Sequence, residues 1–454
     1  MRRACLTLTL FFSLVLAPFA APTAAKDPPK GYCTLWMPLS GQEHATGAKS
    51  ASGELRWITN WAAQNKKGSL AKTQAVPTVP KGSYRAIFEV YYKVGKGKKL
   101  GNLRVWSGGK IIASKDVVGE DYPNHTDGGY QRAFLDFDLP PAGGTNVQLE
   151  FDYFNNHYVW LGAISMHAKG RPFYLLRHRA NNAAKMEQAA RDGANGIEID
   201  IHPYGKSKDA ALYEFYGYHY GDINYTVPDK FGALLAGIKK HMDSGKFVLF
   251  VMDCKQTFVD AAGLVPYGAA DLAKYGKSLA AKVKKAGIPA SKLMLSVPAA
   301  NAGALKKAFA DAGYDVALDA YVESGGSGKE TDWDNIKKWS DGVVKEKATF
   351  QGVGLDEAAR GPFYRYAYRL YQMIHLRDNP ADHKTSIKKV YFWTVNNAKE
   401  TRQLLDYGVD GILTDSVKTI KDVMKEPAYE GLFHLAGPKD RLDTVHHAGT
   451  AVAK

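Results

Sequence analysis

The chain has 454 residues, of which 45% are hydrophobic and 23% are charged, so a disordered chain is excluded and two domains are expected. The formal net charge of +14 favours anionic partners, although a solvated lysine-rich surface would give the same balance. The sequence contains no nucleic-acid-binding motif and only three cysteines, which excludes a disulfide framework and gives no reason to expect a nucleic-acid partner.

Residues 1–25 have the pattern of an export signal. Arg2 and Arg3 precede an apolar run at 6–16, and small residues lead to Ala25, where we expect cleavage. The run is too short to cross a bilayer, and no later segment approaches about 18 consecutive apolar residues. We therefore expect a secreted protein, either extracellular or periplasmic.

Residues 26–168 are expected to form an all-β domain. Segments rich in aromatic and β-branched residues alternate with clusters of glycine, proline and asparagine, which is typical of short strands joined by turns. The predicted strands are 84–94, 103–106, 134–139, 147–154 and 159–166. Their spacing favours a β-sandwich of the jelly-roll kind. Such a domain could bind a glycan or another surface ligand, or it could be a structural cap on the next domain.

From residue 169 to about 430, apolar runs alternate with helical segments. The expected strands are 173–178, 196–201, 247–253, 292–297, 315–320, 349–353, 389–395 and 408–414. The expected helices are 181–192, 229–243, 267–286, 301–311, 332–346, 361–377, 397–406 and 417–425. Eight strands that are each followed by a helix predict an α/β fold of the (β/α)8 TIM-barrel type. Residues 431–454 are expected to be a C-terminal tail.

Polar residues end several of the predicted barrel strands, where the catalytic groups of such barrels lie. Glu198 and Asp200 are two residues apart on one strand and therefore face the same side, and Asp253 ends the next strand. Three hard oxygen ligands without cysteine suit Mg²⁺ or Ca²⁺ better than zinc. We call these three residues the acidic trio. The alternative is that the trio forms salt bridges with Lys255 and other bases.

Two histidines are candidates for acid–base or nucleophilic catalysis. His178 ends the first predicted strand, and His219 lies in a loop after the second, so both are expected at the same rim of the barrel. One could attack or take a proton while the other protonates the leaving oxygen. His202 is a weaker candidate, because it could simply begin the loop.

Several motifs of the barrel region resemble one family. They are His178-Arg179-Ala180-Asn181, the segments 192–200, 250–255 and 295–298, and the strand segments 390–395 and 408–415. Together they resemble the sphingomyelinase D and phospholipase D toxins, which are relatives of the glycerophosphodiester phosphodiesterases. The resemblance covers residues 174 to about 426 and leaves out the N-terminal β domain.

The resemblance implies a role for each candidate. The acidic trio would hold Mg²⁺, and His178 and His219 would be the catalytic pair. Lys255 would hold the phosphate, and Tyr391, Trp393 and Asn396 would lie at the substrate headgroup. The implied activity is removal of the headgroup from sphingomyelin or lysophospholipids at a peripheral membrane surface, by hydrolysis or with release of a cyclic phosphate.

Two positions near the expected headgroup site depart from the family. Asn396 stands where the toxins carry an aspartate, and Asp415 stands where they carry an asparagine. The cysteine-bridged loop of the toxins is also missing. Two alternatives therefore stay open, namely a glycerophosphodiester phosphodiesterase that acts on small soluble diesters and a non-catalytic surface-binding protein.

Overall fold

A computed structural model describes most of the chain after residue 67. The described residues are 48–49, 58–60, 68–73, 75–93, 97–119, 131–154, 158–204, 214–217, 231–255, 257–260, 263–266, 269–321, 341–354, 364–378 and 384–442. The expected export signal and His219 lie outside the described residues. Within the described part of the chain, no helix is long and apolar enough to cross a lipid bilayer.

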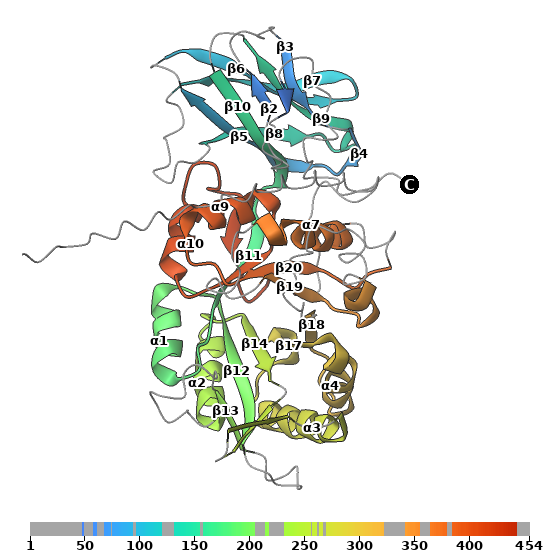
Figure 1. The fold of residues 1–454 in the computed structure, drawn as a ribbon, viewed down its shortest axis with the longest axis vertical. Coiled ribbons are helices and arrows are strands. Elements are labelled where there is room, and N and C mark those ends of the chain that lie inside the picture. Colours follow the sequence, from blue (N-terminus) through green and yellow to red (C-terminus); the bar gives the residue numbers. More distant parts are fainter. Residues whose placement is uncertain are drawn as a thin grey trace, which may run out of the picture.

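The N-terminal β region, residues 48–168, contains two antiparallel sheets (Figure 1). One sheet has the order β1 (Ala48–Lys49), β2 (Ile58–Asn60), β10 (Tyr158–Ala168), β5 (Gly82–Lys93) and β8 (Gln131–Leu139). The other has the order β3 (Gly68–Lys72), β9 (Gly144–Tyr153), β6 (Lys99–Ser107) and β7 (Lys110–Val118), with β4 (Val76–Val79) beside β9. The two sheets share one hydrophobic core, in which Phe88 of β5 lies 6.5 Å from Phe151 of β9 between ring centroids. The five predicted strands are confirmed.

The described residues from 171 onward form a mixed α/β unit built around eight parallel strands. In spatial order these are β18 (Ala317–Tyr321), β17 (Leu293–Pro298), β14 (Leu249–Cys254), β12 (Gly196–Tyr204), β11 (Arg171–Arg177), β21 (Gly411–Thr414), β20 (Lys389–Trp393) and β19 (Phe350–Gly354). The two end strands approach each other, since the Thr349 N–H donates to the Leu318 carbonyl at 2.8 Å. This nearly closed parallel barrel confirms the predicted barrel class, and each predicted strand overlaps an observed one.

Helices follow the strands and cover the outside of the barrel (Figure 1). They are α1 (Ala183–Asp192), α2 (Phe231–Asp243), α3 (Ala269–Lys285), α4 (Ala299–Asp311), α7 (Tyr364–Asp378), α9 (Ala398–Tyr407) and α10 (Val417–Met424). Of the predicted helix at 332–346, only 341–345 is described as helical, and residues 332–340 lie outside the described residues. Short strands β13 (Glu214–Gly217), β15 (Thr257–Asp260) and β16 (Gly263–Pro266) extend the sheet beside β12.

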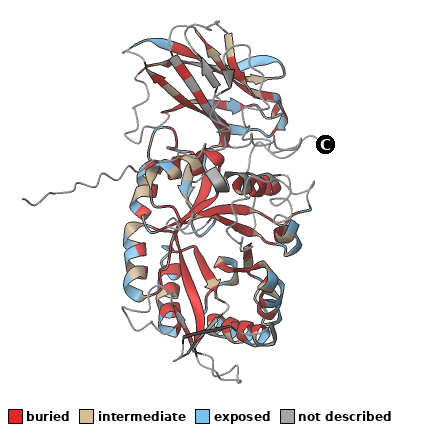
Figure 2. Cartoon of the chain, viewed as in Figure 1, coloured by how far each residue is buried: buried red, intermediate tan, exposed pale blue. Residues whose placement is uncertain are grey.

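Two layers of apolar side chains fix which way the strand residues point. Ile197, Ile199 and Ile201 of β12 pack into the large core between strands and helices, whereas Tyr174 and Leu176 of β11 belong to a separate cluster. Because side chains alternate along a strand, the polar residues between the isoleucines face the barrel interior. Figure 2 shows the corresponding pattern, with buried strands inside and exposed outer faces on the helices.

The segment expected to be a tail begins with ordered structure. Strand β22 (Phe433–Leu435) pairs in parallel with β11, and the Asn195 side chain donates to the carbonyls of Phe173 at 2.8 Å and Ala436 at 3.0 Å. Residues 433–436 therefore pack with the barrel strands.

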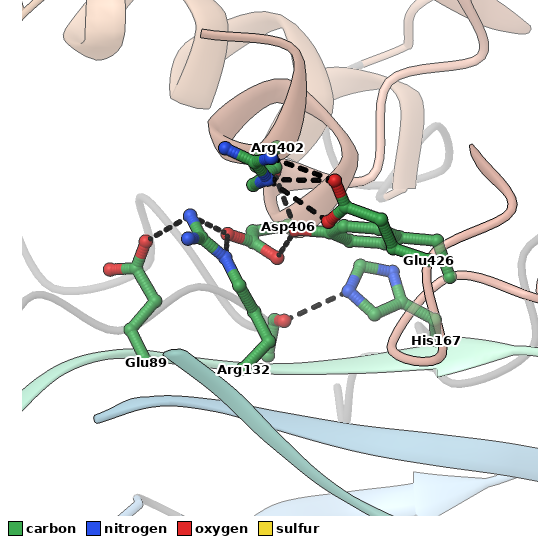
Figure 3. A network of polar contacts seen from close by, with 8 residues as sticks. Glu89, Arg132, His167, Arg402, Asp406 and Glu426 are labelled. Carbon is green, nitrogen blue, oxygen red and sulfur yellow. Dashed lines mark hydrogen bonds and ion pairs between the residues drawn. The ribbon is translucent and has the colours of Figure 1, made fainter. Parts of the chain in front are cut away.

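A buried polar network joins the β region to the barrel. Arg132 of β8 lies between Glu89 at 2.9 Å and Asp406 of α9 at 3.0 Å (Figure 3). Tyr429 also donates its hydroxyl proton to Asp406 at 2.8 Å. A second arginine, Arg85, donates to three backbone carbonyls of the segment that follows α10, at 2.8 to 3.1 Å. The β region and the barrel are thus held together by directional, largely buried contacts.

Candidate active site

Strands β12 and β14 bring the acidic trio together. Asp200 and Asp253 are register partners on the two strands, and Glu198 lies two residues before Asp200. Each of the three can offer a carboxylate oxygen such that all three oxygens lie within 4.8 Å of one another. Glu198 and Asp200 are 3% and 1% exposed. The predicted cluster of three carboxylates is therefore present at one end of the barrel.

Burial and mutual repulsion disfavour the ionised form of the acidic trio. Burial raises the pKa of Glu198 well above its usual range, and the charges of Asp200 and Asp253 raise it further. Burial also raises the pKa of Asp253, by more than the nearby charge of Lys255 lowers it, and the charge of Asp200 adds to the rise. Carboxylates in such a place need a cation to be stable in their ionised form.

Lys255 supplies part of that positive charge. Its amino group contacts Asp253 and lies 2.7 Å from Asp200. Burial alone would lower the pKa of Lys255, but Asp253 and Asp200 raise it well above its usual range, so the amino group is protonated. The salt bridge that the sequence left open as an alternative is therefore present with Lys255.

One oxygen of the trio remains unsatisfied beside this salt bridge. The Oδ1 atom of Asp253 is buried and has no hydrogen-bond partner among the described residues. An orphaned carboxylate oxygen costs free energy in a protein interior unless a ligand binds to it. Three hard oxygen donors, one of them without a partner, fit a divalent cation such as Mg²⁺.

The loop after β11 orients the trio. The Arg179 N–H donates to Glu198 at 2.7 Å, with Arg179 at a φ of 49°. The Asn181 side chain donates to the Asp200 carboxylate at 2.8 Å and accepts from the Asp200 N–H at 3.0 Å. These two supporting residues were visible in the sequence only as parts of the motif that begins at His178.

His178 lies where β11 ends and is 8% exposed. It stands close enough to Asp253 for a positive charge on the imidazole to lower the pKa of that carboxyl. The Nδ1 atom of His178 lies 3.3 Å from the Oδ2 atom of Asp415. The second predicted histidine, His219, lies outside the described residues, so the catalytic pair stays a prediction. His202 is buried and follows Asp200 by two on β12, so it also faces inward.

Three further predicted residues come from β20 and the loop after it. Trp393 is half-buried beside the inner apolar cluster. Asn396 accepts from the Asp415 N–H at 2.7 Å and donates to the Asp415 carboxylate at 3.3 Å. Tyr391 is 2% exposed, so it has little surface to offer a substrate.

The partner of Tyr391 is a residue that the sequence did not single out. Asp319 of β18 accepts hydrogen bonds from the Tyr391 hydroxyl at 2.7 Å, from the Ser296 hydroxyl at 2.8 Å and from the Gly352 N–H at 2.9 Å. Burial raises the pKa of Asp319 to about 6, against these three hydrogen bonds. Asp319 lies in the middle of an apolar strand and has no motif around it, so only its charge could have drawn notice.

Comparisons with known proteins agree with this arrangement. Residues 168–442 match the model of the dermonecrotic toxin SPH family. A dermonecrotic toxin of Loxosceles deserta is 29% identical over 283 residues, which cover 59% of this chain and 97% of the toxin. One from Loxosceles arizonica is 28% identical over 289 residues, covering 60% of this chain and 88% of the toxin.

Among solved structures, a glycerophosphodiester phosphodiesterase from Parabacteroides distasonis covers 56% of this chain and 98% of its own, at 14% identity and a TM-score of 0.38. The segment matched by the family model is more than half of the chain and contains the acidic trio, Lys255 and His178. The chain therefore belongs to the dermonecrotic toxin SPH family.

Proposed function

We propose that this protein is a secreted, Mg²⁺-dependent phosphodiesterase that removes the headgroup from phospholipids such as sphingomyelin or lysophospholipids. The observation that carries the proposal is the acidic trio beside Lys255 and His178 at one end of the barrel. This set combines ligands for a cation with a phosphate-binding amine and a proton acceptor. Metal-assisted cleavage of a phosphodiester uses all three.

Glu198, Asp200 and Asp253 would hold the ion. Bound Mg²⁺ neutralises the phosphodiester and stabilises the charge that develops on its oxygens. Lys255 would turn from the carboxylates to the phosphate when the ion is bound. A second cation at the phosphate keeps the transition state neutralised from two sides.

The two histidines would move the protons. A hydroxyl oxygen of the lipid, or of water, attacks phosphorus and gives its proton to His178. The bond from phosphorus to the headgroup oxygen breaks, and His219 donates a proton to that oxygen. Attack by the lipid hydroxyl leaves a cyclic phosphate, whereas attack by water leaves a phosphomonoester. Trp393 and Asn396 would border the headgroup, with Tyr391 placed behind them.

We also infer the roles of the other segments. Residues 1–25 would be the signal peptide, and 26–168 would form a β-sandwich accessory domain of the jelly-roll kind. The shared core of the two antiparallel sheets supports this architecture. The domain would bind a glycan or another surface ligand and bring the barrel to the membrane as a peripheral protein.

Release of choline by the purified protein tests the proposed function. With Mg²⁺ present, we expect release from sphingomyelin or lysophosphatidylcholine, and we expect EDTA or His178→Ala to remove it. Phosphorus NMR of the product separates the cyclic phosphate from the monoester. Release from glycerophosphocholine alone would instead favour an enzyme that acts on small soluble diesters. If none of the three substrates releases choline, the result would favour a non-catalytic binding protein.

Lys255→Met should make the folded state more dependent on Mg²⁺. Without the amine, Asp200 and Asp253 lose a contacting cation, so the apo form is expected to melt several degrees lower than the wild type. Saturating Mg²⁺ should then raise the Tm of the variant more than that of the wild type. Differential scanning calorimetry with and without Mg²⁺ measures both values. An equal rise of Tm in the two proteins would contradict the proposed exchange between Lys255 and the ion.

A further inference from the structure

We propose that Asp415 is a positioning residue that holds His178 in the tautomer with its proton on Nδ1. The Nε2 lone pair would then accept the proton of the attacking hydroxyl. This inference deepens the proposed function and rests on it for the identity of the reaction. Its structural part, the state of the His178 ring, can be measured without any substrate.

The backbone places the two residues opposite each other. Asp415 follows the last residue of β21 and precedes α10, whereas His178 follows the last residue of β11. Strands β11 and β21 pair in parallel, and the His178 N–H donates to the Thr414 carbonyl at 2.9 Å. The guanidinium of Arg177 also contacts the Asp415 carbonyl oxygen. The two loops therefore leave the barrel in register, and their side chains meet.

Asn396 fixes the carboxylate of Asp415 from the other side. The amide oxygen of Asn396 accepts from the Asp415 N–H at 2.7 Å and from the Thr414 hydroxyl at 3.1 Å. The amide nitrogen of Asn396 donates to Oδ2 of Asp415 at 3.3 Å. An aspartate at position 396 could not donate that last hydrogen bond. The asparagine at 396 and the aspartate at 415 are thus matched to each other.

A carboxylate in this place dictates the tautomer of its neighbour. Burial would raise the pKa of Asp415, but its hydrogen bond to His178 and the charges of His178 and Arg177 lower it further than burial raises it. The group is therefore ionised at neutral pH and can only accept hydrogen bonds. The Nδ1 atom at 3.3 Å must then carry a proton, which leaves Nε2 as the acceptor.

Asp415→Ala tests this role by removing the oxygen that faces Nδ1 of His178. Without that acceptor the ring is no longer held in one tautomer. We expect kcat on the choline-releasing substrate to fall about 100-fold with KM changed less than about threefold, as for the loss of an oriented proton acceptor. Asp422→Ala, on the exposed side of α10, is the matched control and should keep the wild-type kcat.

Asp415→Asn separates the acceptor atom from its charge. In the wild type the Oδ2 atom of Asp415 faces both Nδ1 of His178 and the amide nitrogen of Asn396. Because that amide nitrogen can only donate, it would hold the amide oxygen introduced at position 415 toward His178. We therefore expect kcat of Asp415→Asn to be about tenfold higher than that of Asp415→Ala. A carboxylate that acts only through its charge would give no such difference.

Nitrogen-15 NMR of histidine-labelled protein measures which ring nitrogen of His178 carries the proton, and His178→Gln serves to assign the signal. We expect the Nδ1–H form in the wild type and in Asp415→Asn, and a mixture of tautomers in Asp415→Ala. A wild-type ring that is protonated on Nε2, or an Asp415→Ala variant with unchanged tautomer and kcat, would overturn the inference. If the wild type shows the Nδ1–H form but cleaves no phosphodiester, the positioning contact stands and the proposed function fails.

Discussion

Asp253→Ala is expected to abolish phosphodiesterase activity while the protein stays folded. Asp253 offers an oxygen of the acidic trio that is both buried and without a partner among the described residues, so its removal takes away the donor most available to a cation. Loss of metal-assisted charge stabilisation should lower kcat by about 1000-fold or more. The fold should survive, because Lys255 keeps its ion pair with Asp200 and one of the repelling carboxylates is gone.

Isothermal titration with Mg²⁺ and a thermal melt check this expectation on the same sample. The variant should show Mg²⁺ binding that is weaker by about tenfold or more, with a Tm close to that of the wild type. Asp311→Ala is a suitable control, since Asp311 is an exposed carboxylate that pairs with Lys307 on α4. Undiminished Mg²⁺ binding in Asp253→Ala would show that the ion is held elsewhere.

Arg132→Met is expected to cause a large loss of stability. The change removes the cation that lies between Glu89 and Asp406, whose side chains are 9% and 2% exposed. Removing one partner of a buried ion pair typically costs about 3–5 kcal/mol, because the other charge is left in a poor environment. The unfolding free energy of the full chain in urea measures this loss.

The loss of stability caused by Arg132→Met should also grow as pH rises. Burial raises the pKa of Asp406 to about 7, and Arg132 opposes that rise, so the variant should have a still higher pKa at this position. A carboxyl group with a raised pKa in the folded protein contributes stability below its unfolded pKa of about 3.9, and this contribution is lost as pH rises. The difference between variant and wild type should therefore be greater at a pH of about 8 than at about 5.

Arg191→Met is the matched control for this experiment. Arg191 lies exposed on α1 and donates to Gln188, so its loss should change stability by about 0.5 kcal/mol or less. If Arg132→Met unfolds at the same urea concentration as Arg191→Met, the network in Figure 3 does not stabilise the contact between the β region and the barrel.

The order of elements could be predicted from the sequence because each barrel strand is a short apolar run. Segments such as 249–254, which is buried at nearly every position, alternate with helices that carry one apolar face. The acidic trio followed from the same logic, since a period of two places Glu198 and Asp200 on one face and the barrel rule places Asp253 beside them.

Contacts between distant segments could not be predicted in this way. Asp319 is a single carboxyl within an apolar strand, and its three donors come from three other strands. Arg132 contacts Asp406, which lies 274 positions later in the sequence, and no local sequence pattern predicts a contact between residues so far apart. The contact between His178 and Asp415 likewise depends on the pairing of the first and last barrel strands, which only closure of the barrel brings about.

The proposed function requires that the acidic trio hold a divalent ion beside His178. A crystal soaked in Mn²⁺, which substitutes for Mg²⁺ and gives an anomalous signal, would locate such an ion. We predict one strong peak bonded to Glu198, Asp200 and Asp253, with the amino group of Lys255 moved away from the carboxylates. A map without a peak there, with Lys255 still bridging Asp200 and Asp253, would show that the acidic trio does not hold a divalent ion.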